Sequence, residues 1–271
     1  MAAARRRLDA EMVRRNMMAS REAARKAIAA YQVIVNGSIA DKAARTVLPG
    51  DAIELIGPPP KYVGRGGDKL EGALASFKID PAETNCIDVG SSTGGFTDCL
   101  LQAGASRVVA VDVGRAQLHE RLLNHPQVDV HEQTDIRSVD PEAIGAPFDI
   151  VVIDVSFIGL DQILDIVATL AGPNGTIIAL VKPQFEAGKQ EASKGKGVIK
   201  DPEIWRRVLH ESIDAARRRG MHVGGVDVSP IKGGAGNVEF FLRIGGAMSA
   251  VDDDANDATV NTAVDRACAL P

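Results

Sequence analysis

The sequence predicts an α/β protein in which a doubly wound, mostly parallel sheet with an antiparallel last strand follows a small α+β module. From about residue 82, short apolar stretches alternate with helical segments, a pattern typical of a parallel sheet covered on both faces. Before residue 57, two short helical patterns are followed by period-two alternation and turn residues. A length of 271 residues accommodates one large and one small domain.

The small module carries local signals for two helices and a hairpin. Ser20 is a suitable N-cap for the second helix. Val33 and Val35 alternate before Asn36-Gly37, a strong two-residue hairpin signal. Three consecutive prolines after Gly57 end the regular structure and stiffen the chain. We therefore expect helices at 8–16 and 20–30, a folded module at 5–57 and a linker at 58–64.

The large domain is expected to span residues 65–247. Its last two strands are separated by a short glycine-rich connection that leaves no room for a crossover helix, so they should pair antiparallel. The remaining residues, 248–271, form a tail for which we expect a flexible acidic start and a helix at 258–269. Strands are expected at 86–89, 107–111, 128–131, 148–153, 176–181, 221–228 and 238–244, and helices at 96–103, 118–123 and 160–170.

Composition and charge exclude several classes of protein. Three cysteines without Cys-x-x-Cys spacing argue against a disulfide scaffold and a metal site, and they favour a reducing cytoplasm. No stretch approaches the roughly 18 uninterrupted apolar residues of a membrane helix, and the N-terminus lacks a secretory signal. The net charge is −5, yet residues 1–69 hold 13 Lys and Arg against 7 Asp and Glu. This basic start indicates a polyanion-binding module, although surface arginines can also serve solubility alone.

A glycine-rich turn follows the first strand of the large domain, where a doubly wound sheet binds its ligand. It is neither a Walker A loop nor a clean Gly-x-Gly-x-x-Gly fingerprint. Asp112 lies 22 residues beyond Gly90, a spacing that suits the ribose of either NAD or S-adenosylmethionine. Asp88 adds a carboxylate that favours the cationic S-adenosylmethionine, and Asp135 could bind the adenine amino group. A turn without any ligand remains the alternative.

Four charged residues are expected to meet at the same edge of the sheet: Lys69, Asp154, Lys182 and Glu239. Asp154 and Lys182 follow neighbouring strands, Glu239 lies on the inverted strand, and Lys69 leads into the domain. Two amines and two carboxylates can share a cleft because their charges balance, whereas each would be costly to bury alone. A salt-bridge network without chemistry is the alternative reading.

The small module resembles the RNA-binding domain named after a small-subunit ribosomal protein. The resemblance rests on Arg7-Leu8-Asp9, on Ser20-Arg21 with Ala24, and on Val33 to Gly37. It departs at Tyr31, where the family has glycine at the helix end, so we expect a different cap or local strain. The resemblance implies that basic side chains contact RNA phosphates, and the candidates are Arg5, Arg6, Arg7, Arg14, Arg15, Arg21, Arg25 and Arg65.

The large domain resembles the FtsJ-type ribose methyltransferases, and with the basic module the chain resembles the TlyA family, once described as haemolysins. The strings that carry this are Asp88-Val89-Gly90-Ser91-Ser92-Thr93-Gly94-Gly95-Phe96-Thr97 and Val181-Lys182-Pro183-Gln184-Phe185-Glu186. The resemblance implies a Rossmann-like fold, S-adenosylmethionine as cofactor, and a cytidine ribose in ribosomal RNA or ribosomal subunits as substrate. The implied cofactor contacts are Gly90, Ser91, Ser92, Gly94, Gly95, Phe96, Asp112, Asp135 and Asp154.

The resemblance also implies that the four charged residues are a catalytic tetrad. Lys182 is the candidate base for the ribose 2′-hydroxyl, because a desolvated lysine near another cation can act as a neutral amine. Asp154 would hold Lys182, and Glu239 would orient Lys69 or the ribose; no metal is needed. The alternatives are an RNA-binding protein with an inactive methyltransferase-like domain, a membrane-active haemolysin and, more weakly, a nicotinamide oxidoreductase.

Overall fold

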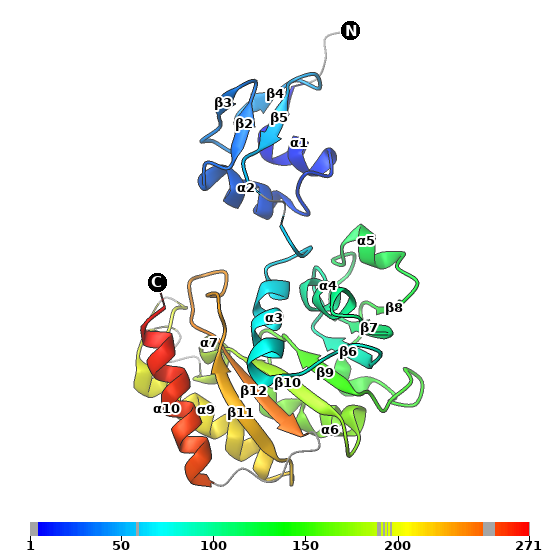
Figure 1. Cartoon of the computed structure of the whole chain (residues 1–271), viewed down its shortest axis with the longest axis vertical. Coiled ribbons are helices and arrows are strands. Elements are labelled where there is room, and N and C mark those ends of the chain that lie inside the picture. The colour runs from blue at the N-terminus through cyan, green and yellow to red at the C-terminus, as the bar shows by residue number, and fades with distance from the viewer. Residues whose placement is uncertain are drawn as a thin grey trace. The chain divides into compact units, whose positions relative to one another are not determined.

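The computed structural model describes residues 5–57, 60–188, 191, 193, 195, 197–245 and 253–270. The chain divides into two compact units, Met1–Gly64 and Arg65–Pro271 (Figure 1). Within the described residues no helix is both long and apolar enough to cross a membrane.

The N-terminal unit is a small α+β fold around its own apolar core, as expected. Its elements are β1 (Arg6–Arg7), α1 (Leu8–Arg14), α2 (Arg21–Ala29), β2 (Val33–Val35), β3 (Ser38–Ile39), β4 (Thr46–Val47) and β5 (Ile53–Leu55). Strand β2 lies between β3 and β5 in an antiparallel sheet, and β1 pairs with β4. The apolar residues of both helices, such as Leu8, Met12 and Ile28, are buried in this core. Those faces are therefore not available for a lipid surface, as a membrane-active haemolysin would require.

The ends of α2 show how the sequence sets a local structure. The Ser20 hydroxyl caps the helix by accepting a hydrogen bond of 3.1 Å from the Ala23 backbone N–H. At the other end Tyr31 takes the left-handed conformation, with φ of +57°. Its N–H donates to Ile28 and that of Gln32 donates to Ala27, the bonds of a Schellman motif. The chain thus keeps the cap that glycine usually provides and accepts the strain of a side chain there.

The large unit contains a seven-stranded sheet in the order β11-β12-β10-β9-β6-β7-β8. Strands β8, β7, β6, β9 and β10 pair parallel, and β12 is antiparallel to both β10 and β11. The expected doubly wound sheet with an inverted last strand is therefore confirmed. The strands are β6 (Asn85–Val89), β7 (Arg107–Val111), β8 (Val128–His131), β9 (Ile150–Ile153), β10 (Thr176–Val181), β11 (Val223–Val228) and β12 (Phe240–Gly245).

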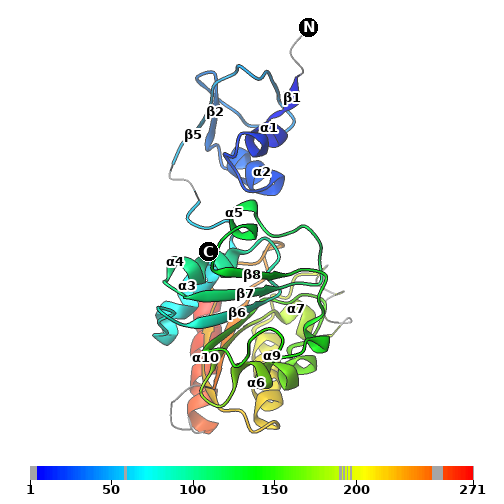
Figure 2. The same cartoon turned by 90° about the vertical axis from the view of Figure 1, so that its right-hand side faces the viewer.

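Helices cover both faces of the sheet, with α3 and α4 on one side and α6 and α9 on the other (Figure 2). Helix α10 packs along the edge strand β11, where Arg266 donates to Asp227 at 2.6 Å. The sequence pattern missed α3 and α9. Of the expected flexible acidic start, residues 248–252 lie outside the described residues, whereas residues 253–257 are helical, so α10 begins earlier than the expected residue 258. The helices are α3 (Gly66–Phe77), α4 (Gly95–Gln102), α5 (Glu120–Leu123), α6 (Leu164–Ala171), α7 (Pro183–Glu186), α9 (Pro202–Arg217) and α10 (Asp253–Cys268).

Replacing Tyr31 should stabilise the N-terminal unit only when the replacement is glycine. A non-glycine residue in the left-handed region costs roughly 1–2 kcal/mol, and glycine's extra chain entropy offsets about 0.5–1 kcal/mol of that gain. We expect Tyr31→Gly to raise the free energy of unfolding by several tenths of a kcal/mol to about 1 kcal/mol, measured by urea denaturation. Tyr31→Ala removes the same ring but keeps the Cβ atom; equal stabilisation by both variants would contradict the strain argument.

Candidate active site

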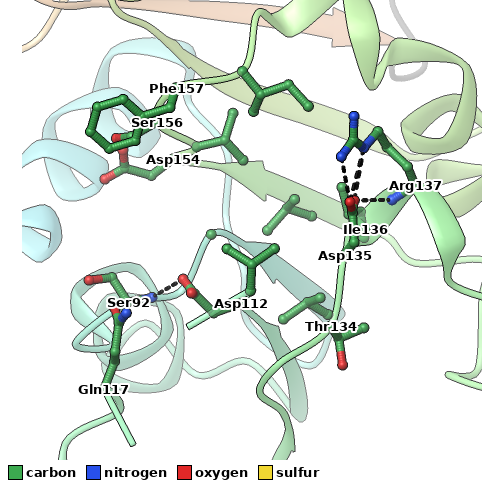
Figure 3. Close-up of a pocket in the computed structure, with 16 residues that line it drawn as sticks. Ser92, Asp112, Gln117, Thr134, Asp135, Ile136, Arg137, Asp154, Ser156 and Phe157 are labelled. Carbon is green, nitrogen blue, oxygen red and sulfur yellow. Dashed lines mark hydrogen bonds and ion pairs between the residues drawn. The ribbon is translucent and has the colours of Figure 1, made fainter. Parts of the chain in front are cut away.

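The carboxyl ends of β6, β7 and β9 open into a cavity of about 480 Å³ (Figure 3). This is the edge at which doubly wound sheets bind their ligands. Gly90, Ser92, Asp112, Asp135 and Asp154 of the expected cofactor contacts line it. Hydrophobic side chains complete the wall, including Val111, Ile136 and Ile158.

The remaining expected cofactor contacts do not line this cavity. The Phe96 side chain is buried, with its ring centroid 6.1 Å from that of Phe241, so cofactor contact by this residue stays a prediction. Ser91, Gly94 and Gly95 form part of the glycine-rich turn itself. Gly94 has φ of +92°, and a Cβ atom there would lie 2.2 Å from a methyl carbon of Leu122.

Gly90 lies at the closest approach between the loop and the neighbouring strand end. It has φ of +87°, and a Cβ atom would lie 2.7 Å from the backbone oxygen of Asp154. Any larger residue would therefore push the loop off the end of β9. The glycine lets the loop and Asp154 line one cavity together.

Two carboxylates on the cavity wall are held in fixed positions. Asp112 accepts hydrogen bonds from the backbone N–H groups of Ser92 at 2.8 Å and Gly114 at 2.6 Å (Figure 3). Asp135 is paired with Arg137, whose Nε donates at 3.0 Å, and the side-chain and backbone hydrogen bonds from Arg137 lower the pKa of the carboxyl to about 2. Asp135 is therefore anionic at neutral pH, and both side chains keep oxygen lone pairs for a ligand.

Asp88 lies behind the loop and is fully buried. Its Oδ2 accepts from the Thr97 backbone N–H at 2.9 Å and from the Thr97 hydroxyl at 2.6 Å, while its Oδ1 has no partner among the described residues. Burial raises its pKa, the hydrogen bonds from Thr97 oppose this rise, and the nearby charges of Asp154 and Asp112 add to it, which brings the pKa to about 7. This concentration of carboxylates favours a cationic ligand and opposes a phosphate-rich one.

The four charged residues form two ion pairs. Lys69 on α3 donates to Glu239 Oε2 at 2.6 Å, and their side chains are 10% and 4% exposed. Lys182, directly after β10, pairs with Asp154, directly after β9, and also donates to the Ser156 hydroxyl at 3.0 Å. These contacts join positions that lie up to 170 residues apart in the chain.

Both lysines face a second cavity of about 420 Å³, which Glu239, Gln184 and Phe185 also line. Ser156 lines both cavities, so the two are adjacent, and Asp154 lines the larger one. The glycine-rich connection makes room for Glu239, because a Cβ atom on Gly233 would lie 2.3 Å from its Oε1. The residues on the wall of the second cavity are Lys69, Ser156, Lys182, Gln184, Phe185, Gly197, Gly234, Ala235, Asn237 and Glu239.

Sequence reasoning missed Phe157, an aromatic residue at the mouth of the larger cavity (Figure 3). It is 91% exposed and has φ of +67°, an uncommon combination for a bulky residue. Its ring lies 5.0 Å from that of Phe185, over which the Lys182 amine lies at 5.8 Å. The signal that could have found it is its position three residues after Asp154. This pair of an exposed ring and a half-buried ring provides a flat surface for a ring-containing ligand.

The candidate RNA contacts divide into two groups. Arg15 donates to the backbone oxygens of Leu48, Pro49 and Asp51, and Arg65 donates to that of Lys232, so both are engaged within their own unit. Arg65 is nevertheless exposed, and phosphate contact by these two residues stays a prediction. The other six have exposed side chains, namely Arg5, Arg6, Arg7, Arg14, Arg21 and Arg25.

No group of three or more metal-ligating side chains that could hold an ion occurs among the described residues.

A family model described as FtsJ-like methyltransferase matches residues 62–245, and a model of the S4 domain matches residues 6–53. The chain belongs to the FtsJ-like methyltransferase family. This confirms the resemblance that was based on residues 88–97 and 181–186. The match covers the sheet, both cavities and all four charged residues of the ion pairs.

Relatives of this FtsJ-like methyltransferase extend over both of its units. The 16S/23S rRNA (cytidine-2′-O)-methyltransferase TlyA of Mycobacterium tuberculosis is 44% identical over 241 residues, 89% of this chain and 90% of the relative. Hemolysin A of Brachyspira hyodysenteriae is 37% identical over 238 residues, 88% of this chain and 98% of the relative. A solved structure of a hemolysin-named protein from Streptococcus thermophilus has a TM-score of 0.77 and 37% identity, covering 98% and 96% of the two chains.

Asp88 should make the stability of this methyltransferase depend on pH. The pKa of its carboxyl is about 7 in the folded state against an ordinary value of 3.8. Between these values the unfolded chain releases a proton that the folded chain keeps, so the stabilising contribution is complete at low pH and is lost as pH rises to about 7. We expect Asp88→Asn to remove this loss, measured by urea unfolding across that range.

The exposed Asp140 provides the control, because Asp140→Asn removes a carboxyl without altering the burial of Asp88. We expect its unfolding curve to follow that of the unmodified protein at every pH. Parallel pH curves for the unmodified protein and Asp88→Asn would show that the buried carboxyl titrates normally.

Proposed function

We propose that the protein transfers a methyl group from S-adenosylmethionine to the 2′-hydroxyl of a cytidine in ribosomal RNA. The observation that carries this proposal is the pair of adjacent cavities joined at Ser156. One is surrounded by carboxylates and suits a cationic methyl donor, and the other holds two lysines that suit a hydroxyl acceptor. The activity named for the Mycobacterium tuberculosis relative supports the same substrate.

The larger cavity fits S-adenosylmethionine. Its volume of about 480 Å³ lies within the usual range for small-molecule sites. Gly90 allows close backbone approach, Asp112 would bind the ribose hydroxyls, and Asp135 would bind the adenine amino group. Asp154 would supply negative potential for the sulfonium and ammonium charges, and a bound cation would favour the ionised form of Asp88. When bound, S-adenosylmethionine supplies an electrophilic methyl group.

Lys182 would take the proton of the 2′-hydroxyl. A lysine acts as a base only in its neutral form, so this role requires the Lys182 amine to lose its proton when cofactor and substrate are bound. Asp154 and Ser156 hold the Lys182 amine in place. Glu239 would fix Lys69, or the ribose, at the opposite wall. The residues thereby align a hydroxyl for in-line attack, and such positioning supplies much of the rate enhancement.

The N-terminal unit would supply the affinity for ribosomal RNA or ribosomal subunits. We assign RNA binding to residues 5–57, the linker to 58–64, catalysis to 65–247 and the tail to 248–271. The S4 match and the basic composition of the start of the chain support this division. The alternative, an RNA-binding protein with an inactive domain, predicts no saturable heat when S-adenosylmethionine is titrated into the protein.

Phe157 and Phe185 would stack on the target base. An exposed aromatic surface beside the acceptor cavity suits an unstacked nucleobase, whose ribose could then reach Lys182. The strained backbone of Phe157 supports this role, since its exposed ring gains little from packing inside the protein.

Replacing Lys182 should separate its role as a base from its role as a charge. We expect Lys182→Ala to lower methyl transfer by roughly 10²–10⁴ with nearly unchanged S-adenosylmethionine affinity. Lys182→Arg keeps the charge but cannot be deprotonated, so we expect a loss of similar size. Transfer would be measured with labelled cofactor, and affinity by calorimetry.

The exposed Lys200 offers the matched control for these variants. We expect Lys200→Ala to retain full methyl transfer. Substantial activity in Lys182→Arg would mean that the residue acts only as a cation, and full activity in Lys182→Ala would remove it from the mechanism.

Removing the exposed ring should weaken substrate binding. Stacking of a base on an aromatic side chain contributes about 1–3 kcal/mol, so we expect Phe157→Ala to raise the KM for RNA by roughly 5- to 160-fold. Phe157→Trp should retain stacking and stay close to the unmodified value. The Kd of S-adenosylmethionine is measured in parallel, because a loss confined to cofactor binding would assign the ring to the donor site instead.

Mass-spectrometric mapping of ribose methylation on ribosomal RNA, after incubation with the protein and labelled cofactor, tests the proposed function itself. A new 2′-O-methylcytidine is the expected product. Methylation on a base, or on no nucleotide at all, would overturn the proposal.

A further inference from the structure

Two carboxylates of the basic N-terminal unit are buried on α1. The side chains of Asp9 and Glu11 are 0% and 1% exposed, although five arginines contact them closely and a sixth lies at 3.8 Å. Asp9 accepts hydrogen bonds from Arg7 at 3.0 Å and from Arg21 and Arg25 at 3.1 Å each. One buried anion on α1 thus gathers three cations, one from the preceding strand β1 and two from α2.

The three arginines around Asp9 remain accessible. The side chains of Arg7, Arg21 and Arg25 are 45%, 51% and 55% exposed. Each guanidinium has five N–H donors in a rigid fork, of which Asp9 uses one or two. Within the described residues, their side-chain hydrogen bonds all end on Asp9. The other donors are free to bind an anion from outside.

The carboxyl group of Asp9 is firmly anionic. The hydrogen bond from Arg7 lowers its pKa the most, those from Arg25 and Arg21 add to this, and together they outweigh the opposing effect of burial. The group therefore fixes the arginines at any physiological pH. The trio carries three positive charges against one negative charge, so it remains a cationic site.

We infer that Asp9 is a positioning residue that assembles Arg7, Arg21 and Arg25 into a preorganised binding site for RNA phosphates. This rests on the proposed function, in which the unit binds ribosomal RNA. Long side chains lose rotamer freedom when they bind a ligand, which weakens binding. Because Asp9 already holds the three arginines in the folded protein, less of that freedom is lost when RNA binds. The planar fork of arginine suits the bidentate geometry of a phosphate.

Arg15 shows the contrasting arrangement on the same helix. It binds Glu11 at 2.8 Å and three backbone oxygens, and its side chain is only 21% exposed. Glu11 thereby ties α1 to the turn before β5. The arginines around Asp9 donate to no backbone oxygen among the described residues, which leaves their other N–H groups for an external anion.

For Asp9→Asn, preorganisation and net charge predict opposite changes in RNA affinity. Asp9→Asn raises the net charge by one, so a simple electrostatic surface would bind RNA more tightly. Preorganisation predicts that the affinity falls about tenfold. Glu22→Gln makes the same change of charge on an exposed residue of α2, and we expect its affinity to be equal or higher. Binding of the full chain to protein-free ribosomal RNA would be measured by filter binding between roughly 50 and 200 mM salt.

The salt dependence of RNA binding distinguishes a variant whose arginines are misplaced from a variant that does not fold. The arginines keep their charges in Asp9→Asn, so the slope of log affinity against log salt should stay unchanged while the affinity falls. In a background of Arg21→Gln and Arg25→Gln, Asp9→Asn should have little further effect. An unchanged or higher affinity for Asp9→Asn, or the same loss in that background, would overturn the inference.

A second variant covers the case in which Asp9→Asn does not fold. Arg21→Lys with Arg25→Lys keeps Asp9 and the charge but removes the guanidinium forks. We expect weaker binding at an unchanged salt slope, and binding equal to that of the unmodified chain would refute the inference. Failure of the unmodified chain to bind RNA at all would instead overturn the proposed function.

Discussion

The site depends on burying two amines and two carboxylates at one edge of a sheet without leaving any of them unpaired. A lone buried charge costs several kcal/mol, so Lys69 and Lys182 can lie in a shared cavity only because Glu239 and Asp154 accompany them. The inverted strand β12 is what makes this possible. Because β12 runs against β10, its first residue Phe240 pairs with Val181, the last residue of β10. Glu239 therefore reaches the edge at which Lys182 begins the next turn.

Asp154 connects the two halves of the site. It pairs with Lys182 on the acceptor side and lines the donor cavity on the other, beside the end of the Gly90 loop. In the proposed mechanism one carboxylate thus contributes to the negative potential around the methyl donor and also orients the base. A substitution at Asp154 would disturb both functions, which makes Lys182 the cleaner position for separating chemistry from cofactor binding.

The sequence predicted the sheet and the residues at its carboxyl edge because these features are local. An apolar strand followed by a polar residue places Asp112, Asp154 and Lys182 without knowledge of the fold. Features that depend on tertiary partners were missed. Phe96 follows the glycine loop in sequence but turns into the core against Phe241, and Phe157 is exposed where hydrophobicity alone suggests burial. Asp9 and Glu11 count as ordinary charges in a composition, although both are buried.

The two units use the same physical device with different cations. In each, a carboxylate that is mostly or fully buried fixes the position of basic groups that face outward or into a cavity. The N-terminal unit holds arginines, which stay protonated under all physiological conditions and present a planar fork to phosphate. The large unit holds lysines, whose amines can give up a proton and so can serve a hydroxyl nucleophile. Exchanging the two residue types would preserve net charge in both units. We would still expect both functions to be damaged. Binding a polyanion requires a group that stays positively charged, whereas deprotonating a ribose hydroxyl requires an amine that can become neutral.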